Sequence, residues 1–235
     1  MQHQTCHWHV YSSAREVQQH AVISIVRSAN RAIAERGEFH IVLAGGSTPR
    51  TVYQLLREAD TSWSSWYVYF GDERCLPPDH PERNSLMAET ALLDYVAIPE
   101  TQIFVIPAEM GAEQAAKAYA NRLAEVDLFD LVLLGLGEDG HTASLFPNHD
   151  WGAGSQTDAV LAVHGAPKPP PDRVSLSAWR LSRSRQVTVL VTGRAKHDAV
   201  ARWRDGVALP IAAITPECGV EVLLEQHCLV SGETD

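Results

Sequence analysis

The sequence has no long hydrophobic run and comparatively few basic residues. No segment reaches the roughly 20 apolar residues of a membrane-spanning helix, and the amino terminus lacks the basic-then-apolar order of a secretory signal. The chain has 19 Lys and Arg residues against 29 Asp and Glu residues, a formal net charge of −10. This charge disfavours general affinity for nucleic acid or anionic membranes. We therefore expect a cytoplasmic protein with no nucleic-acid or membrane partner, in which an anionic substrate requires a local basic site.

Cysteines and metal-ligand patterns are also sparse. The chain contains four cysteines: Cys6, Cys75, Cys218 and Cys228. They form no CxxC pair and no regular framework, so we expect free thiols in a reducing compartment. His3, His7 and His9 lie close to Cys6 but match no zinc-binding spacing. The sequence therefore predicts neither structural disulfides nor a physiological metal site.

Two familiar catalytic loops are missing. The glycines at 45–46 are not part of the pattern GxxxxGK[ST], so a nucleotide P-loop is not indicated. Ser144 has no GxSxG elbow around it, which disfavours a covalent acyl-enzyme on this serine.

The chain instead alternates apolar strands with helices over its 235 residues, without an internal repeat or a clear linker. A capping box at 13–16 predicts a helix that ends at Gly37. Strands are predicted near Val10 and at 39–44, 66–70, 103–106, 131–134, 159–163, 187–191 and 211–214. Further helices are predicted at 49–56, 85–93, 112–124, 195–203 and 220–224. Such alternation predicts a mostly parallel sheet covered on both faces, here in one α/β domain over residues 1–235.

The most distinctive motif, GLGEDGHTASLFP at 135–147, follows the apolar run at 131–134. Its glycines permit tight turns, and Asp139 and His141 place a carboxylate and an imidazole two residues apart. This arrangement fits an active-site loop. Because Asp-Gly is also common in structural turns, this segment alone leaves both interpretations open.

A glycine-rich motif, GGSTPR, follows the strand at 39–44. Gly45 and Gly46 permit close backbone approach, and Ser47 or Thr48 can cap the helix that follows. Amides at such a helix start, with hydroxyls nearby, form an anion site. An ordinary capped turn is the alternative.

Two charged motifs also follow strands. GDER, after 66–70, supplies Asp72 and Arg74 and leads into the proline-rich loop CLPPDHPERN. A loop this long is more often functional than idle, although a solvated surface loop is the alternative for Arg83 and its neighbours. TGRAK, after 187–191, places Arg194 and Lys196 at a helix start. A bound phosphate would account for these cations, and plain solvent exposure is the alternative.

Ligand sites of parallel sheets lie beyond the carboxyl ends of the strands. GGSTPR, GDER, GLGEDGH and TGRAK each follow a strand in that sense, so they should share one edge of the sheet. That edge would combine phosphate-suited amides and cations with two carboxylates and a histidine. The combination predicts an enzyme of phosphorylated metabolites.

Five motifs occur in order: GGSTPR, GDERCLPPDHPERN, GLGEDGHTASLFP, APKPPPDRVSLS and VTGRAKHDAV. They cover about residues 44–199 and resemble the 6-phosphogluconolactonases of the oxidative pentose phosphate pathway. The resemblance implies a three-layer α/β/α domain with a Rossmann-like sheet, related to glucosamine-6-phosphate isomerases. It also implies hydrolysis of a phosphorylated sugar lactone without a metal or organic cofactor. A monomer and a small homo-oligomer both stay open.

The resemblance assigns roles by position. The substrate phosphate would be held by Gly45, Gly46, Ser47, Thr48, Arg173 and Lys196. Arg74 would lie near the sugar and the lactone, and His141 would be the general base with Asp139 as its neighbour. Asp72 occupies the position used for proton transfer in the related isomerases, and its role in a lactonase stays open.

The chain departs from the family pattern in the proline-rich loop. Many relatives have Ser-Asn where this chain has Arg83-Asn84, so only Asn84 carries over as a substrate-binding position. The chemistry of lactone opening is nevertheless served by the motifs. Water must lose a proton to a base such as a neutral imidazole, and Arg74 or loop amides can stabilise the charged carbonyl oxygen.

Two other functions stay open. An amino-sugar phosphate isomerase or deaminase would share the Asp-Gly-His triplet, but those enzymes follow it with a glutamate, in a pattern like DGHIAFNEP. The corresponding position here is Phe146. A non-catalytic sugar-phosphate sensor would need the phosphate groups but not His141 with Asp139, and no DNA-binding appendage is evident in the sequence.

Overall fold

The computed structural model describes residues 4–229, which form a central seven-stranded sheet beside a smaller one. Every strand pair in the central sheet is parallel, in the order β1-β10-β9-β6-β2-β3-β5. Its strands are β1 (Cys6–Tyr11), β2 (Phe39–Leu43), β3 (Trp66–Phe70), β5 (Ile103–Phe104), β6 (Leu131–Gly135), β9 (Val187–Val191) and β10 (Val220–Glu225). The ends of the predicted 1–235 domain lie outside the described residues.

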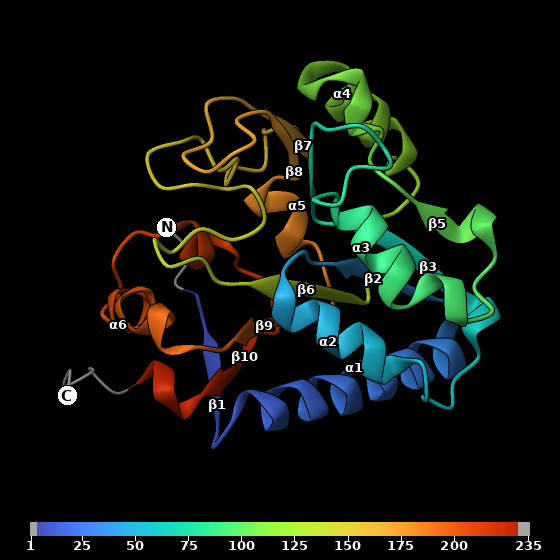
Figure 1. Ribbon diagram of the computed structural model, residues 1–235, viewed down its shortest axis with the longest axis horizontal. Coiled ribbons are helices and arrows are strands. Elements are labelled where there is room, and N and C mark those ends of the chain that lie inside the picture. The colour runs from blue at the N-terminus through green and yellow to red at the C-terminus, as the bar shows by residue number, and fades with distance from the viewer. Residues whose placement is uncertain (1–3, 230–235) are drawn as a thin grey trace.

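Helices lie on both faces of this sheet and make the three layers that the sequence predicts. They are α1 (Ala14–Arg36), α2 (Ser47–Leu56), α3 (Asn84–Ala91), α4 (Ala112–Arg122), α5 (Ala178–Ser182) and α6 (His197–Arg204). Helices α1 and α2 pack together against one face, with α3 beside α2, whereas α4 and α5 lie on the opposite side (Figure 1). The buried residues of α1 recur at three- and four-residue steps, as expected for a helix with one apolar face.

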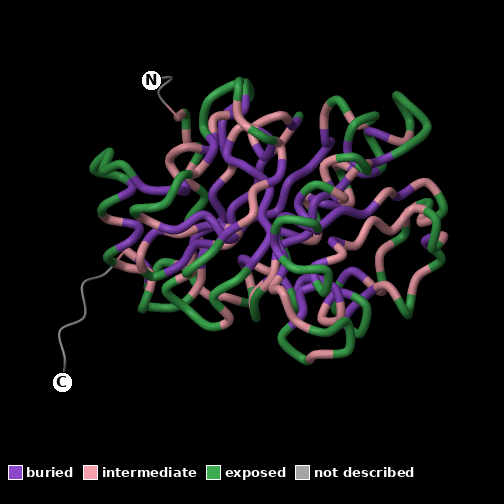
Figure 2. Tube along the Cα trace, turned by 90° about the horizontal axis from the view of Figure 1, so that it is seen from above, coloured by how far each residue is buried: buried purple, intermediate pink, exposed green. Residues whose placement is uncertain are grey.

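The core follows from this layering. Leu131 to Leu134 of β6 and all five residues of β9 are buried, including Thr188. A strand covered on both faces has no solvent side, so its sequence is apolar throughout instead of alternating. Figure 2 shows buried segments of the chain running through the middle of the molecule, with exposed segments around them.

The strand order reverses between β2 and β6. From β2 the chain proceeds to β3 and β5 on one side, and from β6 it proceeds to β9 and β10 on the other. At such a switch point the loops after two neighbouring strands diverge, and the space between them is where ligands bind in open parallel sheets. GGSTPR follows β2 and GLGEDGH follows β6, so the two motifs flank this space.

A three-stranded antiparallel sheet, β4-β8-β7, adjoins the carboxyl edge of the central sheet. Its strands are β4 (Asp72–Arg74), β7 (Val160–Val163) and β8 (Arg173–Leu176). Gly71 joins the two sheets, since its N–H donates to Leu43 O at 3.0 Å and its carbonyl accepts from Leu176 N at 2.8 Å. The charged residues of GDER, which the sequence places just past the end of a strand, therefore form a strand of their own.

The ends of α1 agree with the sequence prediction. Ser13 Oγ accepts from Glu16 N at 3.3 Å, and Gly37 closes the helix at φ 83°. The predicted cap of α2 is wrong. Gly46 is the N-cap residue, and neither Ser47 nor Thr48 forms a capping hydrogen bond because both lie inside the first turn.

Two predictions near the carboxyl terminus are also wrong. The expected strand at 211–214 lies largely in a 3-10 helix, Pro210–Ala213, and the expected helix at 220–224 is β10. Pro210 has no N–H for a strand ladder and its fixed φ suits a helical start. Val220 and Val222 are β-branched and lie buried between β1 and β9. Tertiary pairing therefore decides both segments.

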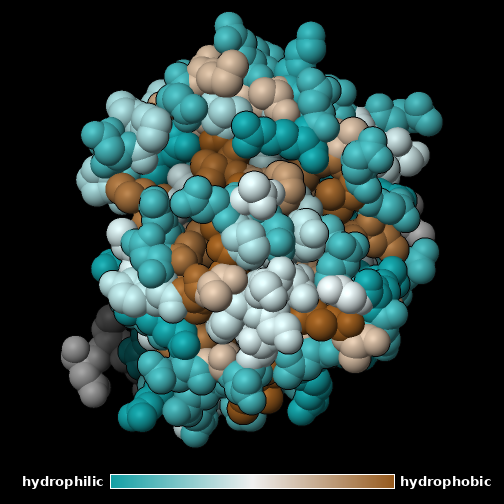
Figure 3. Space-filling model, turned by 90° about the vertical axis from the view of Figure 1, so that its right-hand side faces the viewer, coloured by the Kyte–Doolittle hydropathy of each residue, from teal (hydrophilic) through white to brown (hydrophobic). Residues whose placement is uncertain are grey.

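The large hydrophobic side chains that are exposed come from separate parts of the chain: Val10, Ile23, Leu55, Tyr95, Met110 and Val207. Within residues 4–229 no helix has the length and apolar character needed to cross a bilayer. The side that faces right in Figure 1 is mostly hydrophilic, with hydrophobic atoms in separate groups (Figure 3).

Candidate active site

Contacts between loops place the motifs at one edge of the central sheet. Thr48 Oγ1, in the first turn of α2, lies 2.6 Å from Thr192 Oγ1, which directly follows β9. Lys196 Nζ lies 3.9 Å from Glu138 Oε1, in the loop after β6. GGSTPR, TGRAK and GLGEDGH are therefore neighbours in space, although up to 150 residues separate them in the chain.

His141 and Asp139 form a hydrogen-bonded pair in the loop after β6. Asp139 Oδ1 lies 2.5 Å from His141 Nδ1 and also accepts from His141 N at 3.1 Å. Bonding of Nδ1 to the carboxylate favours the tautomer with the proton on Nδ1, which leaves Nε2 as the nitrogen that can accept a proton. This is the arrangement expected of an oriented general base.

Burial and neighbouring charges set the pKa of each group. Burial lowers the pKa of His141, the hydrogen bond and charge of Asp139 oppose this, and nearby Lys168 lowers it further, so the pKa lies below its ordinary value. Burial raises the pKa of Asp139, but the hydrogen bonds from His141 outweigh burial, so this pKa also lies below its usual range. At neutral pH the imidazole is neutral and the carboxylate is ionised.

The imidazole ring has little room to move. A Cβ atom on Gly137 would lie 2.0 Å from His141 Nδ1, so only glycine allows the ring to occupy this place. The Phe146 ring packs beside the imidazole at a centroid distance of 4.8 Å. The backbone N–H of Gly137 also donates to the His141 carbonyl at 2.7 Å. The loop thus fixes both the backbone and the ring of His141.

Asp72 lies buried beneath this loop, at the start of β4. Ser144 Oγ donates to Asp72 Oδ2 at 2.6 Å, and Asn84 Nδ2 donates to Asp72 Oδ1 at 3.1 Å. Both carboxylate oxygens therefore have donors. The Asp72 charge also raises the pKa of His141, by less than the carboxylate of Asp139 does.

Two arginines face each other across the small sheet. Arg74 of β4 is paired directly with Arg173 of β8. Like charges at opposed positions repel, and an anion between or beside them would offset that repulsion. Arg74 Nε is buried and has no hydrogen-bond partner among residues 4–229, so the hydrogen bonds within this part of the chain leave one N–H of its guanidinium unpaired.

Arg173 is buried against the segment APKPPPD at 166–172, which precedes it in the chain. Its guanidinium donates to the carbonyls of Lys168, Pro169 and Pro170, each at 3.1 Å. Burial lowers the pKa of Arg173, against the opposing charge of Asp72. The predicted phosphate ligand is thus also an anchor for the loop that carries Lys168, close enough to act on His141.

The glycine-rich loop packs tightly against Asn84. A Cβ atom on Gly45 would lie 2.1 Å from Asn84 Oδ1, and Asn84 is itself held by the backbone and side chain of Asp72. Gly46 follows at φ 107° and starts α2 without a side-chain cap. The first amides of α2 are accordingly not occupied by a capping side chain. They remain suited to an anion.

Several neighbours of the site were not predicted from the sequence. They are Glu73, Gly137, Ser144, Lys168 and Thr192. All five belong to motifs that the sequence analysis identifies, so the motifs indicate that they lie near the site. Nothing in their spacing indicates which side chains they contact. Arg83, for which a solvated surface position was one alternative, is 2 % exposed. The loop therefore turns inward only at its end, because the residues from Pro77 to Glu82 are exposed apart from the half-buried His80.

Other features of the chain lie away from this edge. Hollows of about 470 and about 760 Å³ occur near the amino-terminal ends of the strands, lined in part by Arg31, Arg185 and Cys218. They contain none of the residues predicted for the site. His7 and His9 both contact the Glu221 carboxylate, at 2.8 and 2.6 Å, and His3 lies outside the described residues. Within residues 4–229, no three His, Cys, Asp or Glu side chains are grouped to hold a metal ion.

Fold and site together define an α/β/α protein with an acid–base pair and clustered cations at the switch point of a parallel sheet. The chain belongs to the family described as glucosamine-6-phosphate isomerases/6-phosphogluconolactonase, which matches residues 12–223.

Within this family the chain is similar over most of its length to proteins named 6-phosphogluconolactonase. The chain is 37% identical to a 6-phosphogluconolactonase of Synechocystis, over 88% of this chain and 90% of the relative. It is 35% identical to that of Mycobacterium leprae, over 92% of each chain. The solved structure of 6-phosphogluconolactonase from Trypanosoma brucei superposes with a TM-score of 0.82 at 28% identity, over 96% of this chain and 98% of that chain. A monomeric glucosamine-6-phosphate deaminase, at 18% identity and a TM-score of 0.81 over 94% of this chain and 98% of that chain, shares the fold.

Proposed function

We propose that the protein hydrolyses 6-phospho-D-glucono-1,5-lactone to 6-phospho-D-gluconate, the second step of the oxidative pentose phosphate pathway. The relatives at 35–37% identity over most of the chain support this reaction. The observation that carries the proposal is the His141–Asp139 pair at the switch point, next to clustered cations on the same edge. A base beside cations is what hydrolysis of an anionic lactone requires.

In the proposed mechanism His141 Nε2 takes a proton from water as the water oxygen bonds to the lactone carbonyl carbon. Asp139 holds the ring and stabilises the imidazolium that forms. The carbonyl oxygen gains negative charge, which the positive charge of the Arg74 guanidinium can stabilise. When the bond from carbonyl carbon to ring oxygen breaks, the imidazolium returns its proton to that oxygen. No covalent intermediate with the protein forms.

The substrate phosphate would bind at the start of α2. This start of α2 would offer the phosphate the backbone amides of residues 45–48 and the hydroxyls of Ser47 and Thr48. Lys196 would add a positive charge from the segment that follows β9. Arg173 would contribute charge and hold the loop of Lys168 in place. Asn84, fixed between Gly45 and Asp72, would bind the sugar between the two ends.

The position of Phe146 favours the lactonase over the isomerase or deaminase. Phe146 is fully buried and packs on His141, where the isomerase pattern has a glutamate. A phenyl ring cannot accept a proton, so assisted opening of a sugar ring lacks its second acidic group. Attack of water on a lactone needs only the one base.

We further propose that the reaction needs no metal or organic cofactor and takes place in the cytoplasm, in a monomer or small homo-oligomer without nucleic acid. The mechanism above uses side chains alone. All four cysteines are free thiols, which supports a reducing compartment.

The test is the rate of acid release from freshly generated 6-phosphogluconolactone, with and without a chelator. We expect turnover well above spontaneous hydrolysis, unchanged by the chelator. The His141→Asn variant should lose roughly 10²–10⁴-fold in kcat, the usual contribution of a general base. Near-normal kcat in that variant would move the base elsewhere, and activity restored by one metal after chelation would rule out the metal-free mechanism.

A further inference from the structure

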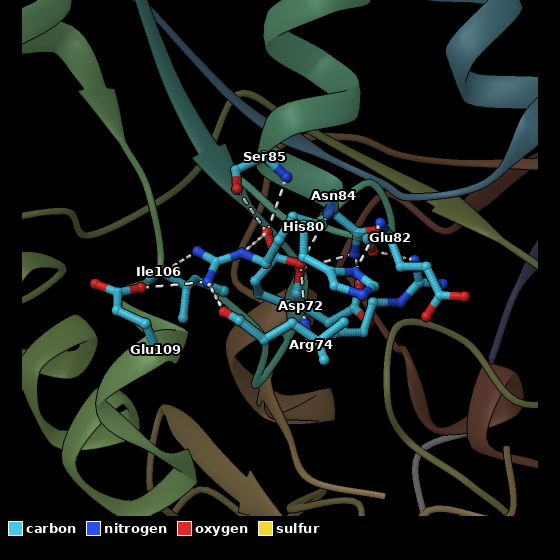
Figure 4. A network of polar contacts seen from close by, with 11 residues as sticks. Asp72, Arg74, His80, Glu82, Asn84, Ser85, Ile106 and Glu109 are labelled. Carbon is cyan, nitrogen blue, oxygen red and sulfur yellow. Dashed lines mark hydrogen bonds and ion pairs between the residues drawn. The ribbon is translucent and has the colours of Figure 1, made fainter. Parts of the chain in front are cut away.

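We propose that Arg83 is a positioning residue, which sets the places of Arg74 and Asn84 in the site through the carboxylate of Glu73. The inference rests on the proposed function. It concerns residues behind the reacting groups, in the loop between β4 and α3, and Figure 4 shows the polar network around them.

Arg83 is a charged residue that is almost wholly buried, with 2 % of its surface exposed. Its Nη1 donates to Leu76 O at 2.8 Å, and its Nη2 donates to Ile106 O at 3.0 Å. Glu73 Oε2 lies 3.1 Å from Nε, close enough for an ion pair although the N–H is not aligned for a hydrogen bond, and Glu109 Oε2 lies 3.2 Å from Nη1. One guanidinium thus links the loop, β4 and the segment after β5.

Glu73 joins the residues that Arg83 helps to hold. Its Oε1 accepts from Arg74 N at 2.9 Å and from Asn84 N at 2.8 Å. Its Oε2 accepts from both the N–H and the hydroxyl of Ser85, each at 2.8 Å. The same carboxylate therefore fixes the backbone of one proposed substrate-binding residue on β4 and of another at the start of α3.

The side chains of these two residues depend on the same loop. Arg74 Nη1 donates to Glu82 O, the residue before Arg83, and Asn84 Nδ2 donates to the backbone and side chain of Asp72. If the guanidinium of Arg83 is removed, Glu73 loses its buried counter-ion and the loop loses two carbonyl anchors. Arg74 would then lose its fixed support at Glu82. A displacement of about 1 Å at such a group lowers catalysis by on the order of 10²-fold.

Arg180 provides a matched control for burial alone. It is 3 % exposed, its guanidinium donates to the carbonyl of Val126, and it packs over the ring of Phe129 at 3.9 Å. It is thus a second buried arginine that binds backbone carbonyls, but it lies in α5 and contacts the segment that precedes β6, at the amino-terminal edge of the sheet. Arg180→Met should lower thermal stability without changing kcat/KM of the folded protein.

The experiment is a double-mutant cycle on the full chain. Arg83→Met should lower kcat/KM for the phosphorylated lactone about 10- to 100-fold, and Arg83→Lys should lie in between because an ammonium can pair with Glu73 but cannot bond both carbonyls in the same geometry. In an Arg74→Met background, Arg83→Met should cost several-fold less than in the wild-type chain, because one of the two residues through which it acts is already gone. Circular dichroism and Tm establish that each variant is folded.

Three results would overturn the inference: unchanged kcat/KM in Arg83→Met, an equal loss in the Arg74→Met background, or an equal loss in Arg180→Met. If Arg83→Met does not fold, the same cycle is run with Arg83→Lys. Binding of 6-phosphogluconate by calorimetry repeats the cycle without turnover. A wild-type protein that binds this ligand but does not hydrolyse the lactone would refute the proposed function alone.

Discussion

A single carboxylate controls both the position and the proton affinity of the proposed base. Asp139 holds His141 at Nδ1 and raises its pKa, but burial has the larger, opposite effect. The active neutral form therefore persists to lower pH than for an exposed histidine. Activity should fall only as the pH drops below the ordinary range of histidine, and should be level through neutrality.

We expect Asp139→Asn to separate these two effects. Loss of the carboxylate charge removes an influence that raises the pKa of His141, so the acid limb of kcat/KM should move to still lower pH. The plateau value should fall by about 10²-fold, because the ring loses its orienting acceptor. Both are read from one pH–rate profile against that of the wild-type enzyme. A limb that moves to higher pH would contradict the assignment of His141 as the titrating base.

At the scale of elements, the loop after β2 can pack against Asn84 only because Gly45 has no side chain. Its neighbour Asn84 occupies the space that a methyl group would need. The backbone of the glycine-rich loop and the start of α3 are therefore in direct contact, which couples the proposed phosphate site to Asn84, the residue proposed to bind the sugar.

Gly45→Ala should consequently displace Asn84 and lower kcat/KM at least 10-fold, with about 1–3 kcal/mol of lost stability from overpacking. The double variant Gly45→Ala/Asn84→Gly should regain the stability but not the activity. Gly154→Ala adds the same methyl group where no atom lies within 4 Å, and should be close to wild type. Chemical denaturation and initial rates measure both effects, and a fully active Gly45→Ala variant would contradict the close contact.

The elements after β9 and in β8 supply the cations. Replacing Lys196 by Ala should raise KM for the phosphorylated lactone about 10- to 100-fold, the scale of one charge-assisted hydrogen bond, with little change for unphosphorylated gluconolactone. Arg173→Ala should affect both substrates, because it also releases the loop that carries Lys168. Equal losses on both substrates for Lys196→Ala would place this lysine outside the phosphate site.

At the scale of the whole molecule, one fold serves two chemistries, and a few side chains decide between them. The deaminase that shares the fold is only 18% identical to this chain. Phe146 lies beside His141 at the position where the isomerase pattern has a glutamate, so the acidic group that this pattern requires is missing here. We expect no measurable ammonia or fructose 6-phosphate from glucosamine 6-phosphate, at enzyme concentrations that consume the lactone within seconds. Appreciable deamination with slow lactone turnover would reverse the assignment.

The local sequence determines the fold class and the edge of the sheet at which the motifs lie. The alternating apolar runs determine a parallel sheet covered on both faces, since a strand such as 131–134 has no polar face to offer to water. The glycine- and charge-rich segments after the strands determine that chemistry gathers at one edge. Asp139 and His141 are two residues apart, so the sequence places them in one loop, but only the structure shows that Asp139 is the group that holds the imidazole.

Only the tertiary structure decided the interactions between distant segments. Segment 220–224 is a strand because it fills the place between β1 and β9. For segment 211–214 the only local indication against a strand was Pro210, which directly precedes it. Three contacts are of this kind, because each joins residues from different segments of the chain. They are the hydrogen bond from Ser144 to Asp72, the packing of Gly45 against Asn84 and the ion pair of Arg83 with Glu73. Local propensity carries no information about such partners, because their free energy comes from burial and pairing that exist only once the sheet has assembled.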